Sequence, residues 1–326
     1  MKLSILDQAP VFPGHTANEA LQAAGELAKL AEQWGYSRYW MAEHHDMKNI
    51  ACSAPESMLG FLGAVTNNIR VGCGAVLLPH YQPYKVAENY NLLASLFPGR
   101  VDIGIGRAPG GSTEASIALS GNFLENVKKM PEKIVELLHF LRDDFPENAF
   151  YAGTKATPVP EKPPVPWMLG TSIKSAELAG RNGTGYVFGQ FMSDNDGQAA
   201  VRQYLNHFEP GPEFSYPYAI VTVNALCAKT QEKAEEIAYS VLQNKVIAEK
   251  QLVNKKAALE IEDEQRIKKE LKKIIAGTPE MVKDKLKEVQ SSFQADEIMV
   301  VTYASNYQQR LDSYRLLYES ILKIDG

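Results

Sequence analysis

Short apolar segments and helix-like segments alternate along the whole chain, and this alternation restricts the possible folds more than any other feature. Eight of the apolar segments are predicted to be strands: Leu3–Leu6, Tyr39–Glu43, Val71–Leu78, Val101–Gly106, Pro166–Gly170, Tyr186–Gly189, Tyr218–Ala228 and Glu297–Thr302. Parallel strands need helical crossovers between them. The pattern therefore predicts an α/β fold, an eight-stranded parallel (β/α)8 TIM barrel, with residues 1–326 as a single domain.

Two segments depart from the simple repeat. Phe150–Pro166 contains five prolines, which fix the backbone and remove donors, so an extended loop is predicted before strand five. Lys229–Lys285 is too long for one crossover and predicts a helical insertion between strands seven and eight. Its charged stretch Asn254–Lys273 is interpreted as either a lid over the barrel mouth or a peripheral helical hairpin. Further on, Thr278 followed by Pro279 predicts a helix start.

Composition narrows the class of protein. The formal net charge of −5 argues against a nucleic-acid or anionic-membrane surface. No apolar run reaches the ~18–20 residues of a membrane span, and the N-terminus does not resemble a signal peptide. The cysteines Cys52, Cys73 and Cys227 are odd in number and far apart, which favours a reducing cytoplasm over a disulfide framework or a zinc site. We therefore expect a cytoplasmic protein.

Polar residues and glycines gather where four of the predicted strands end. These segments are Ala42–Asp46, Gly104–Gly111, Leu169–Ser175 and Asp296–Thr302. Barrel enzymes keep their chemistry at the carboxyl ends of the strands. The four segments are therefore expected to form one site at the barrel mouth.

The adjacent histidines His44 and His45 follow the second strand. Side chains alternate along a strand, so the two histidines should point in opposite directions and cannot bind one metal together. No other His or Cys lies at metal-ligand spacing, so no metal site is predicted. One histidine can face the mouth as a proton donor or acceptor, and the other can be structural. A purely structural role for both is the alternative.

The loop Gly104–Gly111 presents one cation, Arg107. Its glycine spacing does not fit a dinucleotide fingerprint. An arginine offers a planar fork of donors for a phosphate or carboxylate, although pairing with a nearby acid is an equal alternative.

Two further segments suggest contact with a ligand. Gly170, Thr171, Ser172 and Ser175 lie where a strand passes into a helix, and a helix N-terminus with free N–H groups and hydroxyls suits a phosphate. Ordinary capping by Ser172 is compatible with that role. In the third strand, small residues at Gly74-Ala75 would allow a flat aromatic ring to approach, or would only ease packing.

Together these motifs resemble the bacterial luciferase-like flavin monooxygenases, and among them the single-chain oxidoreductases. The resemblance runs from the first strand to the last helix. It rests on Glu43-His44-His45, Gly74-Ala75 with Leu78-Pro79, Phe97–Asp102 leading into Gly104–Arg107, Gly170–Ser175, and Gly277–Glu280 with Glu297–Thr302.

The resemblance implies an enzyme that holds FMN at the barrel mouth, uses O2, and receives reduced flavin from a separate reductase. It implies that His44 performs acid–base work and that Gly74 and Ala75 are joined by a cis peptide against the flavin ring. It further implies that Arg107, Ser172 and Ser175 hold the flavin phosphate.

The resemblance also implies a homodimer formed through the helices near Pro55–Thr66 and Val86–Leu96. The chain departs from the luciferases at Gly106, where they have a reactive cysteine. Light emission with a long-chain aldehyde is therefore not expected.

The sequence leaves two other functions open: a deazaflavin-dependent dehydrogenase on the same barrel, and a non-catalytic flavin-binding protein. The organic substrate is expected to be small. His80, Tyr81 and Phe188 are the candidate side chains for selecting it, and the sequence does not show which of them point inward.

Overall fold

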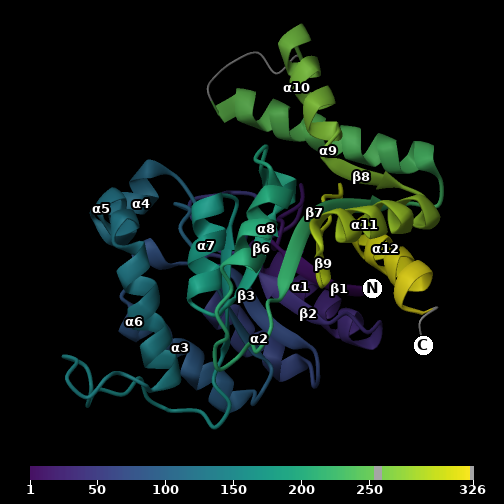
Figure 1. Ribbon diagram of the computed structural model, residues 1–326. Coiled ribbons are helices and arrows are strands. Elements are labelled where there is room, and N and C mark those ends of the chain that lie inside the picture. The colour runs from purple at the N-terminus through teal and green to yellow at the C-terminus, as the bar shows by residue number, and fades with distance from the viewer. Residues whose placement is uncertain (253–258, 324–326) are drawn as a thin grey trace.

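Eight parallel strands close into a barrel with helices around it (Figure 1), in a computed structural model that describes residues 1–252 and 259–323. The barrel strands are β1 (Lys2–Asp7), β2 (Arg38–Met41), β3 (Arg70–Leu77), β4 (Val101–Gly106), β5 (Val165–Gly170), β6 (Gly185–Gly189), β7 (Ala219–Cys227) and β9 (Glu297–Val301). They pair in that order, and β9 closes the barrel on β1. The predicted TIM barrel is confirmed.

The helices occupy the predicted crossovers. They are α1 (Ala17–Gln33), α2 (Pro55–Val65), α3 (Pro83–Leu96), α4 (Thr113–Ser120), α5 (Phe123–Lys128), α6 (Met130–Arg142), α7 (Ile173–Arg181), α8 (Gly197–Asn206), α9 (Gln231–Leu252), α10 (Ile261–Leu271), α11 (Pro279–Phe293) and α12 (Tyr307–Leu317). Thr16 caps α1 and Thr278 caps α11, as their sequence context predicts. The helical sequence after β4 is divided into three helices, α4 to α6.

Because side chains alternate between the two faces of each strand, the core has two parts, one between the strands and the helices and one inside the barrel. Val221 and Val223 face outward, where they pack with the apolar faces of the helices. Ile220 faces inward and packs with residues of other strands, including Trp40 and Val301. The barrel therefore has a filled interior, as expected of eight strands.

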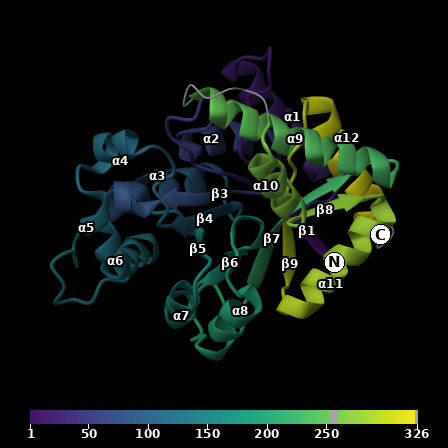
Figure 2. The same ribbon diagram turned by 90° about the horizontal axis from the view of Figure 1, so that it is seen from above.

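The segment after β7 is the largest addition to the barrel. α9 and α10 pack against each other as a helical hairpin, which stands beyond the carboxyl ends of the strands in Figure 1 and partly over them in Figure 2. Lys269 and Lys273 hold it to Asp194, in the loop that follows β6. The predicted helical insertion is confirmed as a hairpin, although part of Asn254–Lys273 lies outside the described residues.

One strand in this insertion, β8 (Ile274–Gly277), was not predicted from the sequence. It pairs with the end of β7, outside the closed barrel. At only four residues, it is too short to show a period of its own. The extended loop predicted before β5 is present: between Arg142 and Val165 the described residues form no helix or strand.

A buried ion network fills the amino-terminal end of the barrel. The Arg38 guanidinium contacts Glu297 through Nε and Nη2 (2.9 and 3.0 Å) and Asp102 through Nη1 (2.8 Å). Asp102 also accepts hydrogen bonds from Arg70 and from the Trp40 indole. Burial raises the pKa of Asp102, but Arg38 and Arg70 lower it by more, so its pKa lies below the ordinary value. Every charge in this network has a partner.

Candidate active site

The predicted site segments follow neighbouring strands. β2, β3, β4 and β5 lie side by side in the barrel, and their carboxyl ends carry His44, Gly74-Ala75, Arg107 and Gly170. Ile105 pairs with Met168, so Arg107 and Gly170 follow two residues later on adjacent strands. The fourth segment, on β9, lies across the mouth beyond β1. The structure therefore brings the predicted residues to one end of the barrel, with most of them on one half of its mouth.

The two histidines have different surroundings, as alternation predicts. His45 Nε2 lies 2.8 Å from Glu43 Oε1, and its backbone N–H donates to Gly110. The side chain of Glu43 is buried and also accepts from Tyr81 Oη (2.6 Å) and from the Leu77 N–H (3.0 Å). Glu43 and His45 therefore join the ends of β2 and β3 behind the mouth.

His44 lies between these two residues and points the other way. Its Nδ1 is buried and has no hydrogen-bond partner among the described residues. Burial lowers the pKa of His44, and His45 adds to this effect, while the nearby Glu43 opposes it. His44 is therefore neutral at neutral pH and can accept a proton.

Close backbone contacts make the wall beside His44 flat. The peptide between Gly74 and Ala75 is cis, as the family resemblance implied. A Cβ atom at Gly104 would lie 2.2 Å from the Cys73 carbonyl, and one at Gly106 would lie 2.9 Å from the Cβ of Ala75. The strands thus approach too closely for side chains here, which explains why glycine stands at position 106.

Arg107 is exposed and directly follows β4 at this half of the mouth. Within the described part of the chain it makes no ion pair or hydrogen bond. The sequence-based alternative, an arginine paired with a nearby acid, is therefore not what the structure contains. Its charge is available to an anionic ligand.

The N-terminus of α7 follows β5 directly. Ser172 caps it, with Ser175 completing the capping box. Gly170 is closely packed, because a Cβ atom there would lie 2.5 Å from Ser175 Cβ. Thr171 and Ser172 are half-buried at the mouth. The N-terminus of α7 and its hydroxyl groups follow β5, and the neighbouring strand β4 leads into Arg107.

The three side chains predicted to select the substrate make other contacts in the structure. Phe188 is fully buried outside the barrel against Phe293, so the prediction that it contacts the substrate was wrong. Val187 is the residue of β6 that faces the barrel interior at this point. His80 contacts the Pro109 carbonyl (2.9 Å), and Tyr81 donates to Glu43. His80 and Tyr81 therefore hold loops in place through these hydrogen bonds.

Two polar side chains at the other half of the mouth were not predicted from the sequence. Gln190 Oε1, directly after β6, and Asn224 Oδ1, on β7, are buried and have no hydrogen-bond partner among the described residues. Asn224 could have been found, because it and Thr222 interrupt the apolar run Ala219–Cys227 on the same face as Ile220.

Other features of the described residues restrict the chemistry. They contain no cluster of His, Cys, Asp or Glu that could hold a metal ion. The three cysteines are buried and unpaired, and burial raises the pKa of Cys73 to about 12, so its thiol is protonated. Across residues 1–252 and 259–323, no helix is both long and apolar enough to cross a membrane.

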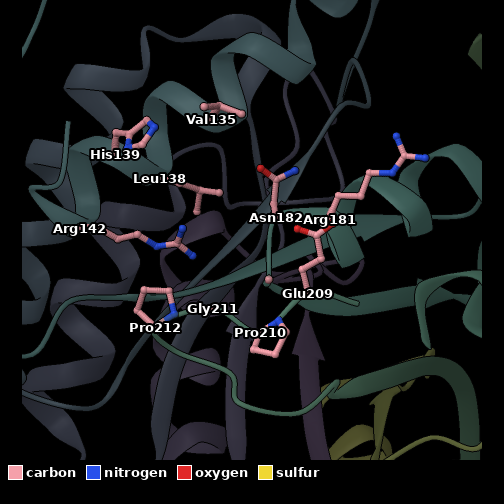
Figure 3. A pocket seen from close by; sticks show the side chains of 11 residues that line it. Val135, Leu138, His139, Arg142, Arg181, Asn182, Glu209, Pro210, Gly211 and Pro212 are labelled. Atoms are coloured by element: carbon pink, nitrogen blue, oxygen red, sulfur yellow. The ribbon is translucent and has the colours of Figure 1, made fainter. Parts of the chain in front are cut away.

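A surface cavity of about 290 Å³ lies away from this site, between α6 and the loops that lead into β6 and β7 (Figure 3). Arg142 lines it, but its guanidinium is already paired with Glu213 through two contacts of 3.1 and 2.7 Å. Arg181 extends away from the other labelled side chains. The guanidinium of Arg142 is therefore not free to bind a ligand, in contrast to that of Arg107 at the mouth.

Known proteins resemble the chain over almost its whole length. The sequence profile of the luciferase-like monooxygenases matches residues 1–295. The N-acetyl-S-alkylcysteine monooxygenase of Bacillus subtilis (strain 168) is 37% identical over 332 residues, covering 99% of this chain and 98% of that protein. The crystal structure of apo-MsnO8 is 31% identical with a TM-score of 0.83, covering 98% and 97%.

Two more distant structures share the fold alone. The oxygenating constituent of 3,6-diketocamphane monooxygenase, in complex with FMN, has a TM-score of 0.71 at 17% identity, covering 98% of this chain and 97% of that one. An F420-dependent secondary alcohol dehydrogenase has a TM-score of 0.70 at 15% identity, covering 98% of both. The profile match over most of the chain and the full-length relatives agree with the site's geometry: the chain belongs to the luciferase-like monooxygenase family, and it is a flavin-dependent, oxygen-incorporating enzyme.

Proposed function

We propose that the protein is an FMN-dependent monooxygenase that oxidises a small organic substrate, with residues 1–326 acting as one domain. The observation that carries the proposal is Arg107, which has no partner among the described residues and follows β4, next to the strand β5 that leads into the N-terminus of α7. A planar cation and a helix N-terminus are the groups best suited to a phosphate dianion. Riboflavin lacks that phosphate, so the geometry favours FMN.

The remaining residues of the cofactor half fit a flat ring. Gly74 and Ala75, with Gly106 behind them, present backbone and a single methyl group. His44 stands at the edge of this wall with an unpartnered Nδ1. Gly170, Thr171, Ser172 and Ser175 would surround the phosphate together with Arg107.

Reduced FMN would supply the two electrons that convert one atom of O2 to water while the other enters the substrate. The protein would bind and orient the flavin and limit the access of water. His44, neutral at working pH, would accept and return a proton beside the ring. The sequence shows no second nucleotide-binding motif, which supports a separate reductase as the source of reduced FMN.

We further propose a homodimer formed through α2 and α3. Leu92 and Leu96 on α3 are 50% and 60% exposed, which is unusual for large apolar side chains close together on one helix. Sedimentation velocity should give a dimer at micromolar concentration. Leu92→Glu combined with Leu96→Glu should give a monomer, and a wild-type monomer would contradict the proposal.

The cofactor is tested by anaerobic titration with reduced FMN, reduced riboflavin and the reduced deazaflavin F420, followed by admission of O2. We expect reduced FMN to bind most tightly and its reaction with O2 to differ in rate from that of free reduced FMN. Tighter binding of the deazaflavin would instead support the dehydrogenase. An unchanged rate with O2 would support a protein that only holds flavin.

The substrate is tested with N-acetyl-S-methylcysteine as the first probe, because the relative named for N-acetyl-S-alkylcysteine is similar over its full length. One atom of ¹⁸O from ¹⁸O2 should appear in the product, as measured by mass spectrometry. Label from water instead would contradict a monooxygenase.

A further inference from the structure

Four barrel strands contribute none of the residues proposed to hold FMN. They are β6, β7, β9 and β1, which are consecutive in the barrel and form the half of the mouth opposite Gly74-Ala75. Leu6 and Val301 are buried in the interior cluster, and Phe191 and Tyr303 are partly buried against it. This half therefore presents an apolar, partly aromatic wall.

Asn224 is one of the polar exceptions on this wall. It is only 4% exposed, yet its Oδ1 has no hydrogen-bond partner among the described residues. Its inward direction follows from two observations. Ile220, four residues earlier on the same strand, is in the interior cluster, and the register partner of Asn224 on β9 is the interior residue Val301. Val301 is the last residue of β9, so Asn224 lies at the level of the mouth.

A buried amide without a partner is costly in a folded protein, and a bound ligand can remove that cost. An amide side chain both donates and accepts, so it is complementary to another amide. Gln190, after the adjacent strand β6, also has an unpartnered buried oxygen. The two side chains give an otherwise apolar wall its polar contacts.

We propose that Asn224 is the specificity-determining residue for the organic substrate, which is largely apolar and carries a neutral amide that hydrogen-bonds to the Asn224 side chain. The proposal deepens the proposed function and rests on it, because it assigns the opposite wall to FMN. It predicts that Asn224 affects recognition of the substrate and leaves recognition of the cofactor unchanged.

The test compares wild type with Asn224→Leu, whose side chain has the same branched shape, and with Thr222→Val as a control on the same face of β7. The probes are the methyl esters of N-acetyl-S-methylcysteine and of 3-(methylthio)propionic acid. They are both uncharged and differ by the acetamido group. Binding of each probe is measured by anaerobic calorimetry on protein saturated with reduced FMN.

Wild type and Thr222→Val should bind the acetamido probe roughly 5–50-fold more tightly than the other, the range for a buried amide that finds or lacks its partner. Asn224→Leu should lose this preference. Equal affinity of wild type for the two probes, or no binding of either, would overturn the assignment.

A second readout needs no ligand. Because Asn224→Leu removes an unpaired buried polar group, it should leave the Tm of the flavin-free protein unchanged or raise it by roughly 1–3 °C. A clearly lower Tm would show a structural asparagine and overturn the proposal.

The affinity of wild type and of Asn224→Leu for reduced FMN distinguishes the remaining outcomes. If Asn224→Leu weakens reduced FMN as much as it weakens the acetamido probe, Asn224 contacts the flavin and the substrate assignment is wrong. If wild type fails to bind reduced FMN at all, it is the proposed function that has failed.

Discussion

The two ends of the barrel differ in whether their buried polar groups have hydrogen-bond partners among the described residues. At the amino-terminal end, Arg38, Asp102 and Glu297 are buried and contact one another through several short hydrogen bonds. At the carboxyl-terminal end, His44 Nδ1 and Asn224 Oδ1 are buried with no partner among the described residues. The same eight strands carry both sets of residues, so the fold itself does not dictate the difference.

This difference indicates that the two ends of the barrel have different roles. A buried charge is tolerated when it is paired and hydrogen-bonded, and such a network stabilises one arrangement of the strands. An unpaired buried polar atom costs about 1–3 kcal/mol, which is sustained where a ligand completes the hydrogen bonding. We therefore expect substitutions at the first end to act on stability, and substitutions at the mouth to act on binding and turnover.

The largest effect is expected at Asp102. Asp102→Ala leaves the buried Arg38 guanidinium short of a partner and should lower the free energy of unfolding by about 3–5 kcal/mol. Urea unfolding followed by circular dichroism measures this loss. The exposed pair Lys128–Glu125 provides the control: Lys128→Ala should cost no more than ~1 kcal/mol. Similar losses for the two variants would contradict a stabilising role for the buried network.

The next effect is expected at His44, on turnover. General acid–base groups contribute ~10²–10⁴-fold, so His44→Ala should lower kcat by that order while the affinity for reduced FMN changes little. His45→Ala is the matched control. It deprives Glu43 of a hydrogen bond and should act mainly on stability. If the two variants had the same profile, the assignment of the mouth-facing histidine would be wrong.

The pH dependence of turnover sharpens this assignment. The folded protein lowers the pKa of His44 below its ordinary value of 6.5, so His44 is neutral above that value and gains a proton as the pH falls through its lowered pKa. Turnover that needs neutral His44 should therefore fall on the acid side, with a midpoint below 6.5. Stability held by neutral His44 should be lost over the same range. His44→Ala should remove this acid limb of the kcat profile.

A smaller effect is expected at Arg107, on binding alone. Arg107→Ala should weaken reduced FMN by about 1.5–3 kcal/mol, the range for a hydrogen bond to a charged group, and should spare riboflavin. The Tm of the flavin-free protein should not change, because Arg107 is exposed and unpaired. Fluorescence titration with both flavins gives the comparison. Equal weakening of both would place Arg107 away from the phosphate.

The sequence could predict the barrel because strand and helix patterns repeat over its whole length. It also predicted that His44 and His45 differ, since alternation is a local property of a strand. It could not show that Arg107 lacks an acidic partner, because that depends on which loops meet. Phe188 was misplaced for a related reason. In a short buried strand both faces are apolar, so the pattern does not show which face is inward.

The contrast between the two ends is tested most directly by hydrogen–deuterium exchange, with and without reduced FMN under anaerobic conditions. We predict that reduced FMN slows exchange in Gly104–Gly111 and Gly170–Ser175 at the mouth. Exchange in Arg38–Met41 and around Glu209–Pro212, beside the cavity of Figure 3, should stay unchanged. Protection around that cavity with none at the mouth would contradict the account.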